Sequence, residues 1–202
     1  MIAGNRWEDA GGRFSTLECA TSAEAAFGEA IAVFRERPGL LARIDAFLAA
    51  SPDPEYDYEL QAAVVPPDYL ATRVLGRAPA NRTARFIDVD HADTHLHASR
   101  DLARLLQEVG RQRFDREVMM SPDRRITRPV ATFYHRISRL ESSRRLRGLR
   151  YQSRLDGGWE CWALWRPLPL KSVTADVTVA TANHPDLAAA ARRLRLRLLP
   201  GA

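Results

Sequence analysis

A strand–turn–strand pattern late in the chain constrains the fold more than any other feature. Residues 149–153 favour a short strand, the pair Gly157–Gly158 supplies a turn, and residues 161–165 favour a second, apolar strand. Consecutive glycines between two such runs are typical of a β-hairpin. Because the first strand delivers Ser153 and Arg154 to the turn, we expect a hairpin with a polar tip. Such a hairpin occurs in many folds, so other regions must narrow the choice.

The other predicted elements mix strands and helices without a regular order. Strands are expected at residues 14–20, 85–89 and 172–180. Thr21, with Glu24 as its capping-box partner, is expected to begin a helix that runs to about Glu36. Further helices are expected over residues 40–50, 67–75 and 94–109, from a cap at Thr127 with Pro129 in its first turn, and from about Pro185. Since regular βαβ alternation is absent, the pattern favours an α+β fold.

Length and composition favour one globular domain over residues 1–202. The chain has 202 residues, of which 46% are apolar, enough for a sizeable core. No segment has the apolar length of a membrane span, and the first residues lack the apolar region of a signal peptide. Cys19 and Cys161 are compatible with a disulfide, but two buried thiols are the simpler interpretation. We therefore predict a soluble cytoplasmic protein without membrane contact.

The basic residues are almost all arginine. The formal net charge is +5, and Lys171 is the single lysine. The arginine runs at 144–147 and 192–197 are suited to an acidic partner or to nucleic acid, because guanidinium groups bind phosphate and carboxylate well. No aromatic residues are interleaved with these runs, as a base-stacking surface would require. We therefore expect solvated basic faces and no direct nucleic-acid binding.

Six short motifs follow one another along the chain, at residues 5–9, 14–20, 25–29, 86–89, 126–128 and 151–154. The first is an Asn-Arg-aromatic-acidic opening, the second a strand, the third a helix that carries a glutamate, and the last a strand that ends in serine. None is specific alone, but in their order and spacing they resemble the RES domain family. The resemblance covers roughly residues 4–165, with residues 166–202 as a C-terminal strand and helix extension.

The resemblance implies a fold like that of ADP-ribosyltransferase toxins, with a split mixed sheet flanked by helices that clasps NAD. For many members it implies a bacterial toxin that cleaves the nicotinamide–ribose bond of NAD, as a glycohydrolase or phosphorylase, with NAD as substrate and no metal. An Xre-type antitoxin neutralises such toxins, which implies a toxin–antitoxin complex or a homo-oligomer as partner states. Some relatives instead transfer ADP-ribose to a protein, so an ADP-ribosyltransferase is an alternative.

The resemblance assigns catalysis to Arg6, Glu29 and Ser153. Cleavage of the nicotinamide–ribose bond builds positive charge on the ribose, which a carboxylate such as Glu29 can stabilise. Arg6 can grip the pyrophosphate or ribose with two hydrogen bonds, and Ser153 can bind the ribose or orient Glu29. Without the resemblance, Arg6 is a surface charge, Glu29 a solvated helix residue and Ser153 the end of a strand.

Three further residues are expected to contact NAD: Trp7, Glu18 and Tyr151. Trp7 can stack on a ring of the ligand, although a core position is equally compatible with the sequence. Glu18 stands where the family has a tyrosine that lines the pocket, and a second carboxylate close to Glu29 would raise one of the two pKa values. The family also carries a strand before the Asn-Arg motif, whereas four residues precede Asn5 here. A RES-like binding module without catalysis is therefore a second alternative.

Two other kinds of site are weaker alternatives. Residues 88–97 contain three aspartates and three histidines, and His91 and His95 have the i,i+4 spacing of a helical metal site. The segment changes from strand to helix near Asp93, which would scatter the ligands, so we expect no metal. A Cys-His nucleophile is weaker still, because Cys19 and Cys161 lie in apolar strands where thiols are usually inert.

Overall fold

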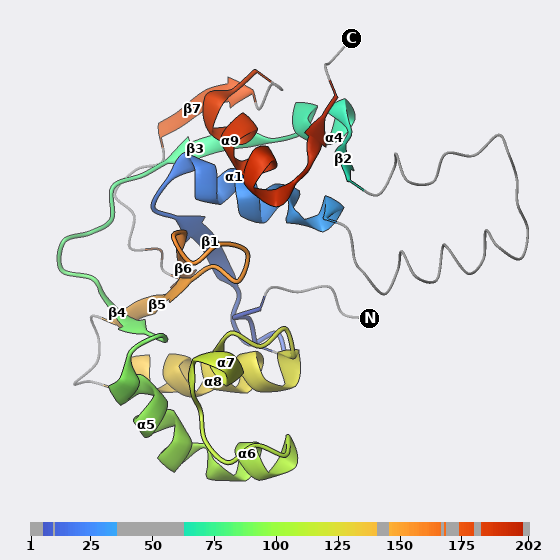
Figure 1. Ribbon diagram of the computed structural model, residues 1–202. Helices are drawn as coiled ribbons and strands as arrows, with labels where there is room; N and C mark the ends of the chain where they lie inside the picture. Colours follow the sequence, from blue (N-terminus) through green and yellow to red (C-terminus); the bar gives the residue numbers. More distant parts are fainter. Residues whose placement is uncertain are drawn as a thin grey trace, which may run out of the picture. The chain divides into compact units, whose positions relative to one another are not determined.

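The predicted hairpin forms the middle of a four-stranded mixed sheet in a computed structural model of the protein (Figure 1). Strands β5 (Leu146–Gln152) and β6 (Glu160–Trp165) are antiparallel, with Tyr151 opposite Cys161. Strand β1 (Thr16–Ala20) extends the sheet antiparallel to β6, and β4 (Arg85–Asp88) lies parallel to β5, which gives the order β1-β6-β5-β4. A mixed sheet with helices was expected, and this part of the fold is confirmed.

The structure describes residues 6–9, 11–35, 63–140, 146–166, 168, 174–179 and 183–199. The helix predicted over 40–50 lies outside the described residues. Contacts divide the chain into two units, one of Met1–Thr21 with Ala78–Val173 and one of Ser22–Arg77 with Thr174–Ala202. The single domain and the likeness to ADP-ribosyltransferase toxins stay predictions.

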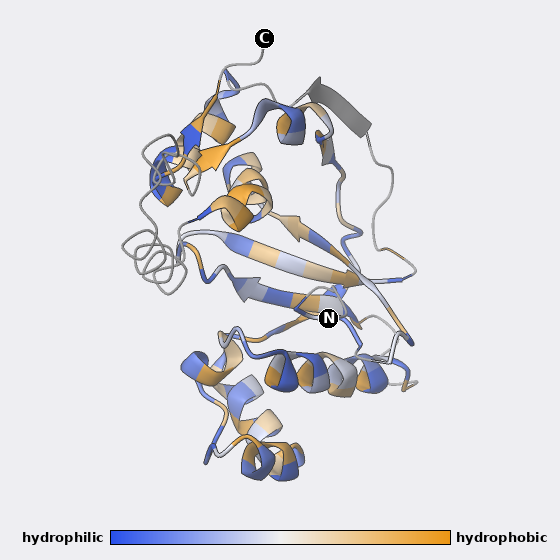
Figure 2. Ribbon diagram, turned by 90° about the vertical axis from the view of Figure 1, so that its right-hand side faces the viewer, coloured by the Kyte–Doolittle hydropathy of each residue, from blue (hydrophilic) through white to orange (hydrophobic). Residues whose placement is uncertain are grey.

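One face of the sheet in the first unit is buried under helices. Side chains alternate between the two faces of a strand, and Figure 2 shows alternating bands of hydrophobic and hydrophilic residues on the strands. Leu149 and Tyr151 on β5 and Ala163 on β6 pack in one core with Val130 and Tyr134 of the helical layer. Helices α5, α6, α7 and α8 form this layer on one side of the sheet (Figure 1).

Gly148 on β5 permits the close approach of the two central strands. It lies opposite Leu164, and a Cβ atom at this position would come within 2.1 Å of the carbonyl oxygen of Ala163. No larger residue fits without a backbone shift. The hairpin therefore needs glycine at this position of its first strand.

The helices of the first unit differ in detail from those predicted. The single helix expected over 94–109 is two, α5 (Ala92–Asp101) and α6 (Ala103–Glu108), because Leu102 leaves the helical region of the backbone. The four-residue helix α7 (Arg116–Met119), capped by Asp115, was not predicted.

The longest described helix, α8 (Arg124–Ser138), begins earlier than its predicted start. Asp123 caps it by accepting a hydrogen bond from the backbone N–H of Arg125. The predicted cap, Thr127, is instead buried within the helix, and Pro129 is its sixth residue rather than part of its first turn. A proline at that depth removes one backbone hydrogen bond, which the packing of the buried face must offset.

The second unit joins two helices and two small sheets. Helix α1 (Ala23–Ile31), followed by a 3-10 turn over Ala32–Phe34, packs against α9 (Pro185–Leu194), and Glu24 pairs with Arg193 at 2.5 Å. The predicted helix over 67–75 is the shorter α4 (Pro67–Ala71) followed by a strand. The two-stranded sheets pair β2 (Val64–Val65) with β8 (Arg197–Leu198) and β3 (Val74–Arg77) with β7 (Thr174–Val179).

The cap of α1 is Ser22, not the predicted Thr21. The Ser22 hydroxyl accepts a hydrogen bond from the backbone N–H of Ala25 at 3.1 Å. The Thr21 hydroxyl is used elsewhere, since it donates to Glu160 at 2.7 Å and accepts from the indole N–H of Trp162 at 3.0 Å. Both residues are capable caps, and the hydrogen bonds of Thr21 to β6 decide between them.

Within the described part of the chain, no helix is long and apolar enough to cross a membrane.

Candidate functional site

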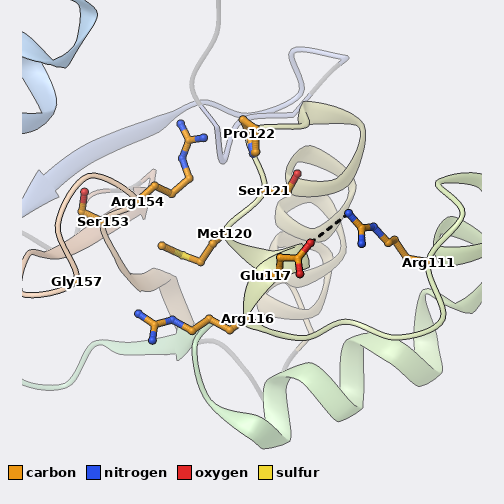
Figure 3. Close-up of a pocket in the computed structure, with 9 residues that line it drawn as sticks. All are labelled: Arg111, Arg116, Glu117, Met120, Ser121, Pro122, Ser153, Arg154 and Gly157. Carbon is orange, nitrogen blue, oxygen red and sulfur yellow. Dashed lines mark ion pairs between the residues drawn. The ribbon is translucent and has the colours of Figure 1, made fainter. Parts of the chain in front are cut away.

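An open pocket of about 640 Å³ lies in the first unit, where the β5–β6 turn meets the segment from the end of α6 to the start of α8 (Figure 3). This volume is within the range of small-molecule sites in proteins. Three of the lining residues are arginines, and one is a glutamate. The lining consists of Arg111, Arg116, Glu117, Met120, Ser121, Pro122, Ser153, Arg154 and Gly157.

Ser153, one of the three predicted catalytic residues, lines this pocket. It follows the last residue of β5, and its backbone N–H donates to the carbonyl of Trp159 at 2.8 Å, which closes the hairpin. Its hydroxyl accepts a hydrogen bond from the backbone N–H of Leu155 at 2.9 Å. The residue is 3% exposed. The hairpin turn therefore holds the Ser153 hydroxyl in one orientation.

The three arginines of the pocket come from three separate segments. Arg111 follows α6, Arg116 begins α7, and Arg154 lies in the hairpin turn. Arg111 pairs with Glu117 at 3.4 Å, and Arg116 donates to the side-chain oxygen of Gln152 at 2.6 Å. All three side chains belong to exposed residues. Arg111 and Arg116 were not predicted, because no local pattern in the sequence shows that they lie in one pocket with Arg154.

Arg6, a predicted catalytic residue, comes together beside the pocket with two predicted NAD contacts, Trp7 and Tyr151. The Arg6 guanidinium lies 4.5 Å from the ring centre of Trp7 and 5.6 Å from that of Tyr151, and the two rings are 5.5 Å apart. Arg6 also donates to the carbonyl of Met119 and lies 3.8 Å from the sulfur of Met120, which lines the pocket. Arg6 thus packs behind the pocket wall.

Trp7 and Tyr151 are core residues. Trp7 is 0% exposed and Tyr151 is 5% exposed, and both belong to the main hydrophobic core of the first unit. For Trp7 this is the core position that the sequence allowed. Neither ring is part of the pocket lining. Their packing with Arg6 therefore supports the loop that carries Met120.

A buried carboxylate anchors the segment that carries Arg6 and Trp7. The Asp9 carboxylate accepts two hydrogen bonds from the Arg13 side chain, at 2.7 and 3.1 Å, and one from the backbone N–H of Arg13 at 3.0 Å. The hydroxyl of Thr132 on α8 donates to it at 2.9 Å. The Arg13 hydrogen bonds hold the pKa of the Asp9 carboxyl well below its usual range. Asp9 therefore fastens this segment to α8.

The face of β5 opposite Leu149 and Tyr151 carries a second group of paired charges. The Arg150 guanidinium pairs with Asp88 on β4 at 2.7 Å and with Glu160 on β6 at 2.6 Å. Hydrogen bonds from Thr21 and then from Arg150 lower the pKa of Glu160, and Glu160 in turn raises the pKa of Arg150. These pairs join three strands of the sheet, which is a structural role.

Glu18 and Glu29 are both exposed, and neither lines the pocket. Glu18 lies on the edge strand β1 opposite Ala163. Glu29 lies on α1 in the second unit, where its neighbours Phe27 and Gly28 are buried. The role of Glu29 in catalysis and that of Glu18 in NAD binding stay predictions from the family resemblance.

The histidines of residues 88–97 have separate local roles. His91 caps α5 through a hydrogen bond from the backbone N–H of Asp93, at 3.2 Å. The imidazole of His95 lies 2.8 Å from the carbonyl oxygen of Val89, and that of His97 lies 2.8 Å from the Asp101 carboxylate. Within the described ranges, no group of three or more histidine, cysteine or acidic side chains is arranged to hold a metal ion.

The two cysteines are free thiols on the neighbouring strands β1 and β6. Burial, and secondarily the charge of Glu18, raises the pKa of the Cys19 thiol. A raised pKa disfavours the reactive thiolate. The structure therefore gives no support to a thiol nucleophile at Cys19.

Comparison of the chain with protein-family models, with curated proteins and with solved structures finds no match.

Proposed function

We propose that this protein is an enzyme that consumes NAD by cleaving the bond between nicotinamide and ribose. One juxtaposition supports the proposal most directly. Ser153 lines an arginine-rimmed pocket, and the packed group of Arg6, Trp7 and Tyr151 supports Met120 on its wall. These four residues come from both ends of the RES-like region, and the fold of the first unit brings them together.

The proposed reaction gives each group a defined task. The bond from ribose C1′ to the nicotinamide nitrogen breaks, and its electron pair leaves with nicotinamide, which becomes neutral. Positive charge develops on the ribose, and the family resemblance, rather than a contact in the structure, assigns its stabilisation to a carboxylate, that of Glu29. An oxygen of water or of phosphate then bonds to C1′, and an attacking water loses one proton to the solvent. Ser153 orients the ribose, and the pocket arginines are suited to the pyrophosphate.

Family resemblance extends the proposal to biological role. An enzyme that depletes NAD is toxic to its own cell, so we propose that it is a toxin restrained by an Xre-type antitoxin. Transfer of ADP-ribose to a protein side chain uses the same bond cleavage with a different acceptor, and is the alternative activity.

One observation favours a different class, a RES-like binding module without catalysis. Trp7 is fully buried, and the Arg6 guanidinium hydrogen-bonds the Met119 carbonyl, so both serve the packing of the pocket wall. A binding module would retain the pocket and bind NAD without turning it over.

Incubation of the purified protein with NAD, with and without phosphate, tests these alternatives. We expect release of nicotinamide, with ADP-ribose as the product in water or its 1-phosphate if phosphate is the acceptor. The Glu29→Gln variant should lose at least about 100-fold in rate, because a single oriented charge at a transition state contributes that much. Glu108→Gln, the same change on an exposed helix of the first unit, is the matched control and should keep full activity.

Each negative result has its own meaning. If the wild type binds NAD without consuming it, the binding module is favoured. Labelled ADP-ribose on a protein in place of free product would identify a transferase. A fully active Glu29→Gln enzyme would exclude the assigned mechanism.

A further inference from the structure

The exposed charges around the pocket include more positive than negative side chains. The lining contains three arginines, Arg111, Arg116 and Arg154, and one carboxylate, that of Glu117, so it carries an excess of two positive charges. Figure 3 shows the Arg111 side chain directed toward Glu117 and those of Arg116 and Arg154 directed to other sides of the pocket. Like charges gathered in a hollow repel each other, and they raise the local potential for an anion. Binding of an anion would relieve this repulsion.

The present partners of these arginines can be displaced. The Arg111–Glu117 pair is 3.4 Å long, and its side chains are 50% and 78% exposed. Such an exposed pair contributes little to stability. The partner of Arg116 is the neutral amide oxygen of Gln152, which binds a guanidinium less strongly than an anion does. An incoming anion therefore competes with weak contacts.

The rest of the lining suits a ligand with phosphate groups. Ser121 and Ser153 place hydroxyl groups in the wall, and Gly157 adds no side chain. The guanidinium fork matches two oxygens of one phosphate, and three forks from three segments exceed what one phosphate needs.

We propose that this pocket is a diphosphate-binding subsite, in which Arg116 and Arg154 hold adjacent phosphate groups and the ligand displaces Glu117 from Arg111. The inference deepens the proposed function, and it rests on that function for the identification of the diphosphate as part of NAD. The anion chemistry itself is independent of whether the protein turns NAD over.

Calorimetric titration with inorganic pyrophosphate and with ADP tests the proposal at constant ionic strength, because screening would otherwise obscure the effect. We expect both to bind the wild type. Arg116→Gln and Arg154→Gln should each weaken binding by about fivefold or more, as expected for loss of a charged hydrogen bond at an open site. Glu117→Gln should strengthen binding by about threefold, because it removes the competing carboxylate.

Arg113→Gln is the matched control. Arg113 lies between Arg111 and Arg116, is 79% exposed, is 3.9 Å from Asp115 and is not part of the lining. The variant loses the same charge and should bind pyrophosphate like the wild type. Equal losses in Arg113→Gln and Arg154→Gln would show a general charge effect and would overturn the proposal. Thermal unfolding of each variant confirms that the fold is retained.

The two proposals fail separately. NAD consumption without pyrophosphate or ADP binding would overturn the subsite and leave the enzyme. Pyrophosphate binding that depends on Arg116 and Arg154, without NAD consumption, would support the subsite and argue against the enzyme. Binding of ADP but not of free pyrophosphate would overturn recognition of the diphosphate itself.

Discussion

The first unit holds two groups of arginine that differ in what they face. Arg13 lies against Asp9, a carboxylate that is 1% exposed, and Thr132 completes its hydrogen bonds. Arg116 and Arg154 face an open pocket, with Gln152 as the partner of Arg116. A buried carboxylate needs its partners permanently, whereas an exposed guanidinium keeps capacity for a ligand. Arg13 therefore serves the packing of the fold, whereas Arg116 and Arg154 are the arginines that our proposal assigns to a ligand.

The largest expected effect on stability comes from removal of the buried carboxylate that binds Arg13. Asp9→Ala should lower the free energy of unfolding by about 1–3 kcal/mol, because it removes a buried acceptor on which three groups converge. It should change pyrophosphate affinity less than Arg154→Gln does, because the Asp9 segment lies behind the pocket wall, whereas Arg154→Gln should lower the affinity and leave stability nearly unchanged. Chemical denaturation and calorimetry of the two variants measure both quantities. Asp93→Ala, which removes a carboxylate that is 91% exposed, is the control and should change stability by less than about 0.5 kcal/mol. Loss of anion binding in Asp9→Ala would show that the two regions are coupled.

The second prediction tests the same carboxylate by pH. The pKa of Asp9 is lowered in the folded protein, mainly by the Arg13 hydrogen bonds. Its contribution to stability is therefore complete above the unfolded carboxyl pKa of about 4 and is lost progressively as the pH falls below it. The stability difference between the wild type and Asp9→Asn should shrink from about pH 6 to about pH 3. Urea denaturation at several pH values measures it, and a constant difference would contradict the assigned ion pair.

The sequence predicted the parts of the fold that local patterns specify. The hairpin, the strands at 14–20 and 85–89 and the final helix were found, because each has its own local pattern of apolar residues. The structure narrows them to Thr16–Ala20, Arg85–Asp88 and Pro185–Leu194. The two-residue strands β2 and β8 were missed, since two residues are too short to show a period.

Helix ends were predicted less well, because several candidates stood close together. Thr21 and Ser22 are both good caps, and only the contacts of Thr21 with β6 exclude it. Thr127 was the predicted cap, with Pro129 in the first turn, yet Asp123 caps the helix. In both places a tertiary contact or a buried face outweighed the local preference.

The candidate site was predicted in part. Ser153, singled out by the family resemblance, lines the pocket, and its role in catalysis stays a prediction. Arg111 and Arg116 were missed, because their meeting with Arg154 depends on how α6, α7 and the hairpin pack. The cation–π contact of Arg6 with Tyr151 likewise joins residues that are distant in the sequence. The residue types thus indicated a kind of site, and contacts between distant segments determine which arginines line the pocket.

Arg195, in the second unit, is an arginine whose substitution is expected to have the smallest effect on stability. Arg195 ends α9 in the left-handed region, with φ 57°. Its backbone N–H donates to the carbonyl of Arg192 at 3.1 Å, and that of Leu196 donates to the carbonyl of Ala191 at 2.8 Å. This is the Schellman arrangement, in which glycine is the preferred residue. At this position the backbone conformation, and not the partner of the side chain, determines how a substitution changes the free energy of unfolding.

Arg195→Gly should therefore stabilise the protein by up to about 1 kcal/mol, because glycine adopts this conformation without steric strain and loses part of the gain to its greater freedom when unfolded. Arg192→Gly, the same substitution inside α9, should destabilise by about 1 kcal/mol, because glycine is a poor helix residue. Urea denaturation of the two variants measures the pair of opposite signs. If both variants lose stability, the Arg195 side chain stabilises the fold by more than its backbone strain destabilises it. Arg195 would then have a structural role, as Arg13 has.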